Sequence, residues 1–282
     1  MKKILVLSII FIACIASCDK IDKPYRVSEN VISCDTPSFA TLDDNAVIQK
    51  YLLEDYTGHK CPNCPRAQVI SARMKTQMGD TLVLIAIHSG TLARPENTTG
   101  YCSYSANYNT EVGNEYTEKF LISTYPSGLI NRRSFNGSQI LSDSHWETTL
   151  NAIVRETPTI GVQIMTENNG GEACVFVKTT LLSDMSNTLR LNVLLIEDGI
   201  ISAQKYGTRD SCEYVHNHVL RTSFAPVVGD NLTVSQRNDS QIKGYSLKLN
   251  DTWKKENCHI IAFISDANTD EILQVEEAKL IE

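Results

Sequence analysis

The chain contains 282 residues, with 26 lysines and arginines against 33 aspartates and glutamates, and a formal net charge of −7. This acidic balance argues against nucleic acid or an anionic membrane surface as a partner. The sequence contains no P-loop, metalloprotease, serine-hydrolase or dinucleotide-binding motif, so we expect no cofactor and no chemistry of those classes.

The N-terminus has the pattern of an export signal. Lys2 and Lys3 precede fourteen largely apolar residues, a run too short to span a bilayer. The run ends in Ile15-Ala16-Ser17-Cys18, which resembles the lipobox of bacterial lipoproteins. The resemblance implies that residues 1–17 are a signal peptide and that Cys18 is acylated, with palmitate among the expected chains. Residues 18–45 would then form the lipid anchor and tether.

Residues 46–157 are predicted to form an α/β domain. The strand-like segment 51–56 is followed by Cys61 and Cys64, by apolar residues at helical spacing, and by the continuous apolar run 81–87. This order predicts a strand, a helix and a parallel strand, with a Cys-x-x-Cys pair at the start of the helix. The positive end of a helix lowers the pKa of a leading thiol, so Cys61 is the candidate nucleophile and Cys64 its resolving partner.

The same domain resembles the thioredoxin superfamily. Tyr125-Pro126 precedes the short strand-like run 128–131, and the superfamily places a cis-proline beside its Cys-x-x-Cys just before such a strand. The resemblance implies a cis Tyr125–Pro126 bond and substrate binding by both residues, with the Tyr125 backbone pairing with an extended peptide. Asp55 lies six positions before Cys61, where thioredoxins carry a buried acid that helps move the proton of the resolving thiol.

The residues beside the cysteines depart from the superfamily pattern. Lys60 replaces the aromatic residue that thioredoxins carry before the first cysteine, and His59 precedes it. Positive charge on these two residues is expected to favour the Cys61 thiolate and to make the pair oxidising. Two other interpretations of the motif are a static disulfide and half of a metal site, although no second Cys-x-x-Cys completes a zinc set.

In the remaining residues, 158–282, the sequence pattern is typical of β-strands. About seven short strands are separated by turns, and one of them is predicted over 214–224. This pattern predicts an all-β immunoglobulin-like sandwich, which is typical of binding or spacing modules. Alternation along the strand would place His216 and His218 on one face, so these histidines are weak candidate metal ligands. Exposed strand histidines without a ligand are the commoner alternative.

Cysteine usage fits an oxidising compartment. Outside the signal, the lipid site and the Cys-x-x-Cys pair, five cysteines remain, at positions 34, 102, 174, 212 and 258. An odd number leaves at least one of them unpaired within the chain. The sequence does not define the pairing, and positions 174 and 258, inside apolar strand-like runs, fit either buried thiols or one bridge between strands.

Four features together resemble the Bacteroidetes outer-membrane lipoproteins of the 28-kilodalton (Omp28) type. They are the lipobox, the run LLEDYTGHKCPNCP at 52–65, the run YPSGLINR at 125–132, and the His-x-His of the β domain. The resemblance covers nearly the whole chain. It implies an outer-membrane lipoprotein with a thioredoxin-like domain, lipid-anchored and facing the periplasm or the cell surface.

The expected function is thiol–disulfide exchange on extracytoplasmic proteins, in which Cys61 attacks, Cys64 resolves and Asp55 relays a proton. The β-sandwich would recruit partners or form a homodimer, and the N-terminal lipid would make the contact with the membrane. The alternative is a non-enzymatic surface or periplasmic binding protein, such as an adhesin or receptor component. It would use the thioredoxin frame as a scaffold and Cys61–Cys64 as a permanent disulfide.

Overall fold

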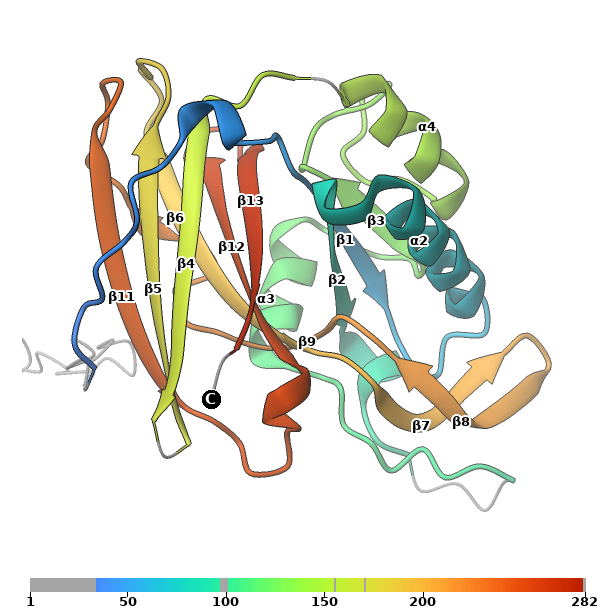
Figure 1. The fold of residues 1–282 in the computed structure, drawn as a ribbon. Helices are drawn as coiled ribbons and strands as arrows, with labels where there is room; N and C mark the ends of the chain where they lie inside the picture. Colours follow the sequence, from blue (N-terminus) through green and yellow to red (C-terminus); the bar gives the residue numbers. More distant parts are fainter. Residues whose placement is uncertain (1–33, 97–100, 155, 170, 281–282) are drawn as a thin grey trace, which may run out of the picture. The chain divides into compact units, whose positions relative to one another are not determined.

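The computed structural model describes residues 34–96, 101–154, 156–169 and 171–280 (Figure 1). The predicted signal peptide and the predicted lipid site Cys18 lie outside these residues. The helices of the described part are α2 (Cys64–Met78), α3 (Glu111–Lys119) and α4 (Asp143–Ile153), with the short 3-10 turns η1 (Asp44–Ala46), η2 (Gly79–Thr81), η3 (Gly90–Ala93) and η4 (Lys255–Asn257). None of these helices is both long enough and apolar enough to cross a membrane.

The strands make up most of the regular structure. In chain order they are β1 (Tyr51–Thr57), β2 (Leu82–His88), β3 (Ser127–Ile130), β4 (Ile160–Asn169), β5 (Glu172–Leu181), β6 (Leu189–Glu197), β7 (Ile200–Tyr206), β8 (Arg209–His216), β9 (Val219–Ser223), β10 (Asp230–Asn231), β11 (Ser240–Lys248), β12 (Cys258–Asp266) and β13 (Ile272–Lys279).

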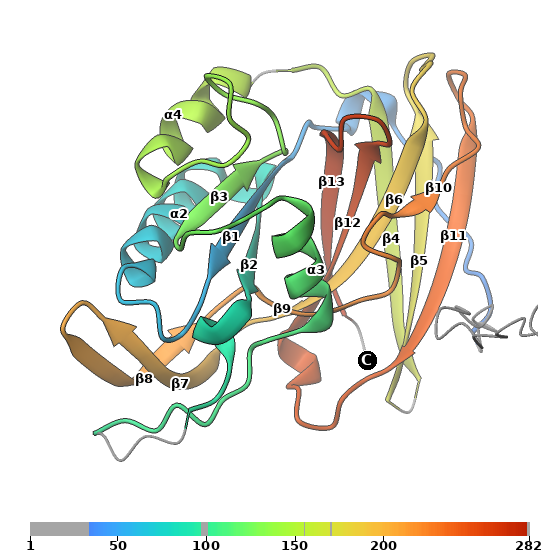
Figure 2. The ribbon, with the colours of Figure 1, turned by 180° about the vertical axis from the view of Figure 1, so that it is seen from behind.

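One mixed sheet runs through both halves of the chain, in the order β13-β12-β6-β9-β2-β1-β3, with β10 paired to β6 (Figure 2). As predicted, β1 and β2 are parallel, and β3 is antiparallel to β1. Strand β9 joins the halves, because it pairs antiparallel with β6 and makes one parallel bridge, from Val219 to Ala86 of β2. The fold is therefore β-rich with few helices, and its main sheet continues across the predicted boundary after residue 157.

The alternation of side chains along β1 explains how the helices cover this sheet. Leu53 points toward α2 and α4, where it packs in a core with Met74 and Trp146. Leu52 points to the opposite face and packs in a core with Tyr116 of α3. Every residue of β1 and β2 is buried, as expected for parallel strands covered on both sides.

In the second half, β4, β5 and β11 form a separate three-stranded sheet. Its inner face packs against β6 and β12 of the main sheet, in a core that includes Val175, Val177, Leu191, Val193 and Ile260. Two facing sheets are thus present, but one of them continues into β9, β2 and β1. This continuity differs from the prediction of one fold followed by a separate sandwich.

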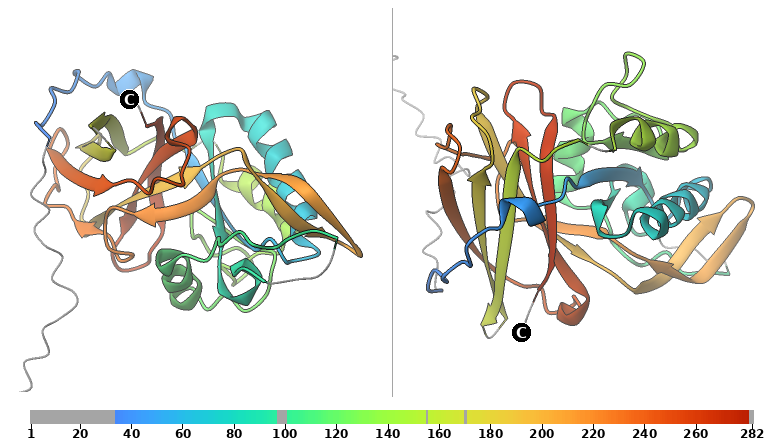
Figure 3. Two further views of the ribbon diagram at one scale, coloured as in Figure 1. Left: turned by 90° about the horizontal axis from the view of Figure 1, so that it is seen from below. Right: turned by 45° about the horizontal axis from the view of Figure 1, so that its top comes forward.

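Strands β7 and β8 form a hairpin that pairs with none of the other described strands. The hairpin extends from the main sheet and lies beside α2 (Figure 3). The single strand predicted over 214–224 is interrupted, because β8 ends at His216 and β9 begins at Val219. His218 lies in this break with a φ of 58°.

Candidate functional site

The Cys-x-x-Cys pair lies in the connection between β1 and α2, where the sequence predicted it. Cys61 and Cys64 form a disulfide, and their Cα atoms are 5.4 Å apart. Helix α2 begins at Cys64, after Asn63 at the N-cap position and with Pro65 in its first turn. Proline suits this turn because its missing N–H would have no partner within the helix. Cys61 therefore lies just before the first turn of the helix.

Both cysteines are enclosed by the protein. The exposed fraction is 2% for Cys61 and 0% for Cys64. The candidate nucleophile Cys61 is therefore not reachable from solvent in this conformation. Since an attacking thiolate must contact a sulfur atom of the disulfide, a protein substrate has no access to the pair here.

The β7–β8 hairpin covers the Cys-x-x-Cys loop. The side chain of Gln204 donates from Nε2 to the carbonyl oxygens of Cys61, at 3.1 Å, and of Gly58, at 3.4 Å. Two backbone hydrogen bonds of 2.8 Å also join the hairpin to this loop: Lys205 N–H to His59 O and Gly207 N–H to Pro62 O. The hairpin thus binds the loop through main-chain carbonyl groups on both sides of Cys61.

A second disulfide ties the hairpin to the segment that follows η3. Cys102 and Cys212 are 110 residues apart in sequence, with Cα atoms 5.0 Å apart. Close by, the Tyr104 hydroxyl donates to Asp210 Oδ1 at 2.8 Å, and Cys102 and Tyr104 pack against Ala203 of β7. The hairpin is therefore held over Cys61 by a covalent bond that the sequence alone did not reveal.

The other cysteines resolve the alternatives left by the sequence. Cys174 forms a disulfide with Cys34, and Cys258 is a buried thiol. A bridge between positions 174 and 258 is therefore wrong, and only Cys258 fits the interpretation of a buried thiol.

Asp55 is buried on β1, as the resemblance to thioredoxins implied. Its exposed fraction is 5%, and its Oδ1 atom has no hydrogen-bond partner among the described residues. Burial, together with the smaller effect of the nearby charge of Asp143, raises the pKa of this carboxyl from 3.8 to about 8. A carboxyl with such a pKa can accept or release a proton near neutral pH.

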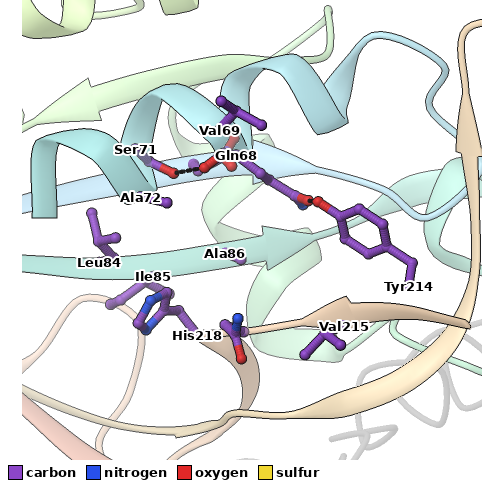
Figure 4. Close-up of a pocket in the computed structure, with 12 residues that line it drawn as sticks. Gln68, Val69, Ser71, Ala72, Leu84, Ile85, Ala86, Tyr214, Val215 and His218 are labelled. Carbon is purple, nitrogen blue, oxygen red and sulfur yellow. Dashed lines mark hydrogen bonds between the residues drawn. The ribbon is translucent and has the colours of Figure 1, made fainter. Parts of the chain in front are cut away.

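Asp55 lines a cavity of about 210 Å³ beside α2. Gln68 and Ser71 of α2 lie on one side of this cavity, and Tyr214 of β8 hydrogen-bonds through its hydroxyl to Gln68 (Figure 4). Gln68 follows Cys64 by one helical turn. Asp55 therefore lies beside helix α2, which begins at Cys64.

Three buried histidines surround Tyr108 next to the Cys-x-x-Cys loop. His59, His88 and His216 are each at most 1% exposed, and their ring centres lie 5.3, 4.9 and 4.9 Å from that of Tyr108. Burial lowers the pKa of His59 and of His216 to about 4, and the pKa of His88 also falls well below its usual value. The histidines are therefore neutral at pH 7.

This cluster corrects the expected electrostatics of the pair. Because His59 is neutral, it adds no positive charge beside Cys61. Lys60 is engaged by Glu96, with Nζ to Oε2 at 3.1 Å. The sequence missed the cluster, since its histidines come from three distant segments. The only local signal was that His88 ends a fully buried strand.

His216 and His218 do not share a strand face. His216 packs against Tyr108 and Tyr214, whereas the backbone N–H of His218 donates to Asp198. The two weak candidate ligands therefore belong to different surroundings. No group of three or more metal-binding side chains was found in the described part of the chain.

The Tyr125–Pro126 peptide bond is cis, as the resemblance implied. Pro126 immediately precedes β3, in which Ser127 pairs with Tyr56 near the end of β1. The Tyr125 hydroxyl hydrogen-bonds to Ser89 Oγ at 2.8 Å. Both candidate substrate-binding residues therefore lie at the edge of the sheet from which the loop to Cys61 begins.

A known protein family matches the larger part of the chain. A family model described as outer membrane protein Omp28 matches residues 113–282, which is more than half of the chain. The chain belongs to the Omp28 family. The match includes Tyr125 and Pro126 but does not cover Cys61 and Cys64. The family match therefore gives no information on the Cys-x-x-Cys pair. No curated protein matches the sequence.

Three solved structures are similar to parts of the chain at low sequence identity, and the first two have a related fold. HBP35 of Porphyromonas gingivalis is 15% identical with a TM-score of 0.62, over 82% of this chain and 75% of that one. Protein AGR_C_4864 from Agrobacterium tumefaciens is 16% identical with a TM-score of 0.50, over 84% and 97%. A domain of the outer membrane lipoprotein Omp28 from P. gingivalis is 21% identical with a TM-score of 0.33, over 44% and 90%.

Proposed function

We propose that this Omp28-family protein is an outer-membrane lipoprotein that exchanges disulfides with extracytoplasmic proteins at Cys61–Cys64. The environment of Asp55 is the observation that carries the proposal. A buried carboxyl group without a partner destabilises a fold, and a static disulfide has no use for one. A resolving thiol does need a base that is active near neutral pH, and the pKa of Asp55, about 8, meets that need.

The exchange would proceed in two steps. In the reduced protein, the Cys61 thiolate attacks a substrate disulfide, forms a mixed disulfide and releases one substrate thiolate. Asp55 accepts the proton of the Cys64 thiol, and the Cys64 thiolate attacks the Cys61 sulfur. The second substrate thiolate leaves, two electrons have passed to the substrate, and Cys61–Cys64 is oxidised. The reverse sequence oxidises a substrate dithiol.

Tyr125 and Pro126 are assigned to substrate binding in this scheme. Pro126 immediately precedes Ser127, which pairs with Tyr56 on β1. An extended peptide aligned with the backbone of Tyr125 would therefore lie beside the loop that leads to Cys61. Because the β7–β8 hairpin encloses Cys61, the hairpin must move before such a peptide reaches the sulfur.

The reduction potential of Cys61–Cys64 tests the proposal directly. We expect a value between roughly −120 and −270 mV, the range of exchange proteins, by alkylation and mass spectrometry in redox buffers. In parallel, a Cys64→Ser variant should trap mixed disulfides through Cys61, and a Cys61→Ser, Cys64→Ser double variant should trap none. A potential below about −300 mV together with no trapped partner would contradict exchange.

A second candidate function is non-enzymatic binding, with the Cys-x-x-Cys pair as a permanent disulfide. The burial of both sulfurs favours it, because a structural disulfide needs no access. On this view the protein is a surface or periplasmic binding protein, such as an adhesin or receptor component. Its distinguishing prediction is that replacing both cysteines by alanine lowers stability without changing binding to a partner.

The membrane anchor is proposed from the sequence and from the family. The Omp28 of P. gingivalis is named an outer membrane lipoprotein. We assign residues 1–17 to the signal peptide, Cys18 to acylation and residues 18–45 to the anchor and tether. A Cys18→Ala variant should leave the membrane fraction, whereas the control Cys14→Ala should remain in it. Protease treatment of intact cells then distinguishes the periplasm from the cell surface.

The β-rich half is proposed to recruit partners or to form a homodimer. In this scheme residues 46–157 are the thioredoxin-like part, residues 158–282 are the sandwich, and β9 joins them in one sheet. Light scattering of the detergent-solubilised full chain measures its oligomeric state. A dimer that survives dilution supports self-association, and a monomer at all concentrations leaves partner recruitment as the role of this half.

A further inference from the structure

We propose that the disulfide Cys102–Cys212 is a second thiol–disulfide exchange site, which reacts with an external dithiol reductant and thereby releases the hairpin over Cys61–Cys64. The consequence for substrate access rests on the proposed function of Cys61–Cys64. The reactivity of Cys102–Cys212 itself does not.

The two disulfides differ in exposure. Cys212 is exposed on β8, although its partner Cys102 is only 2% exposed, whereas both Cys61 and Cys64 are at most 2% exposed. Cys102 lines an open hollow of about 360 Å³ that also borders Lys60 and Lys205. Access to a sulfur atom governs the rate of exchange, so a reductant in solution meets Cys102–Cys212 first.

Apart from the disulfide, the hairpin is held by individual hydrogen bonds, such as those of Gln204, Lys205 and Gly207, and by few buried side chains. Outside its own ladder it pairs with no other described strand, and a two-stranded hairpin alone is marginally stable in water. Few of its side chains are buried, chiefly Ala203, Gln204 and His216. Elements with few buried apolar contacts open at low free-energy cost. The disulfide is thus the one covalent cross-link from the hairpin to another described segment.

The chemistry at this site balances without a cofactor. A thiolate of the dithiol attacks Cys212 Sγ, forms a mixed disulfide and releases Cys102 as a thiolate. The second thiol of the reductant loses its proton to solvent. The resulting thiolate attacks the reductant's first sulfur, which is bonded to Cys212 in the mixed disulfide, and releases Cys212 as a thiolate. The reductant becomes a disulfide, two electrons enter Cys102 and Cys212, and both thiolates take up protons from solvent.

Release of the hairpin then changes the Cys-x-x-Cys loop. The bonds from Gln204, Lys205 and Gly207 to the loop are all made by the hairpin, so its departure frees the carbonyl groups around Cys61. The sulfurs become reachable for a protein substrate. Reduction of the outer disulfide would therefore precede, and permit, exchange at the inner one.

The order of reduction in the native full chain tests this inference. The protein is treated with dithiothreitol, and the released thiols are alkylated at successive times and quantified by mass spectrometry. We expect label on Cys102 and Cys212 first, and on Cys61 and Cys64 at least tenfold more slowly. Label on Cys61 and Cys64 at an equal or earlier time would overturn the proposal.

A matched pair of variants separates the effect of the hairpin from a general loss of stability. In a Cys102→Ser, Cys212→Ser protein, Cys61–Cys64 should be reduced at least tenfold faster than in the parent. Amide exchange at Lys205 and Gly207 should accelerate with it. The control Cys34→Ser, Cys174→Ser removes a disulfide elsewhere and should change neither rate. Equal acceleration in both variants would overturn the proposal.

Failure of the proposed function gives a different result. Cys61–Cys64 could become accessible after reduction of Cys102–Cys212 and still trap no partner. That result would contradict the proposed exchange function and would support the proposed reactivity of Cys102–Cys212. If Cys61 traps partners while Cys102–Cys212 stays oxidised, the exchange function is supported and this inference is overturned. The order of labelling in the unmodified protein decides the inference even if the double serine variant does not fold.

Discussion

Arg132 and Glu54 form a buried ion pair through two hydrogen bonds of 2.8 Å, from Nε to Oε2 and from Nη2 to Oε1. Their side chains are 1% and 0% exposed. The guanidinium also lies 4.6 Å from the ring centre of Phe120 on one side and 4.8 Å from that of Phe263. Since Glu54 belongs to β1 and Phe263 to β12, this cluster joins the two halves of the chain.

Replacing Arg132 by methionine should destabilise the protein by about 3–5 kcal/mol, because Glu54 would remain buried without a partner. Denaturant unfolding followed by circular dichroism, with the disulfides intact, measures the change. The control is Arg73→Met, which removes an exposed ion pair with Glu147 and should cost less than about 1 kcal/mol. Equal losses in the two variants would show that the buried pair has no special role in stability.

The free energy of unfolding of the parent protein should fall as pH rises, because of Asp55, and the Asp55→Asn variant should not show this fall. The carboxyl has a pKa of about 8 in the folded protein and 3.8 as its ordinary value. Between these values the unfolded chain is ionised while the folded chain keeps the proton, so stability falls as pH rises and levels off above about 8. At pH 8 the variant should be more stable than the parent, by a few kcal/mol, since one pKa unit corresponds to about 1.4 kcal/mol.

Unfolding midpoints measured from pH 4 to 9 check this prediction. The exposed residue Asp80 supplies the control, because Asp80→Asn should follow the pH profile of the parent protein. Parallel profiles for the parent and for Asp55→Asn would mean that Asp55 titrates normally.

His216→Phe should make the protein less sensitive to acid. The pKa of His216 is about 4 in the folded protein, against 6.5 as its usual value, chiefly because the ring is buried. As pH falls below 6.5, the unfolded chain binds a proton that the folded chain does not, and stability is lost down to about pH 4. On acidification, the variant should lose roughly 2–3 kcal/mol less unfolding free energy than the parent, because its ring keeps the contacts with Tyr108 but does not titrate.

The measurement is the free energy of unfolding at pH 7 and pH 4.5 for the parent and two variants. His145→Phe, at an exposed position of α4, should lose as much stability in acid as the parent. If His216→Phe loses as much as this control, the buried ring does not contribute to acid sensitivity.

Gln204→Ala should loosen the hairpin without changing the rest of the fold. The variant leaves the carbonyl group of Cys61 without its Gln204 donor, at a cost of about 1–3 kcal/mol, whereas Gly58 O still accepts from the Cys61 N–H at 3.0 Å. Amide hydrogen exchange at Lys205 should therefore accelerate by roughly tenfold or more, since 1.4 kcal/mol corresponds to a factor of ten. Gln241→Ala on β11 removes a bond to Thr233 and should leave this exchange rate unchanged.

The sequence alone determined the elements around the Cys-x-x-Cys pair. Spacing of apolar residues predicted β1, α2 and β2, and the resemblance to thioredoxins implied that Asp55 is a buried acid. The cis Tyr125–Pro126 bond followed from the resemblance. The helix and the two strands were predictable because periodicity acts between residues a few positions apart, whereas Asp55 and the cis bond were recognised by their resemblance to thioredoxin motifs.

The tertiary structure alone decided what surrounds the pair. The bond from Gln204 to Cys61 spans 143 residues, the Cys102–Cys212 disulfide spans 110, and the Arg132–Glu54 pair spans 78. Such contacts leave no periodic trace in the sequence, because they arise only when distant strands are packed side by side. Whether the cysteines were open or covered therefore depended on the packing of the β7–β8 hairpin.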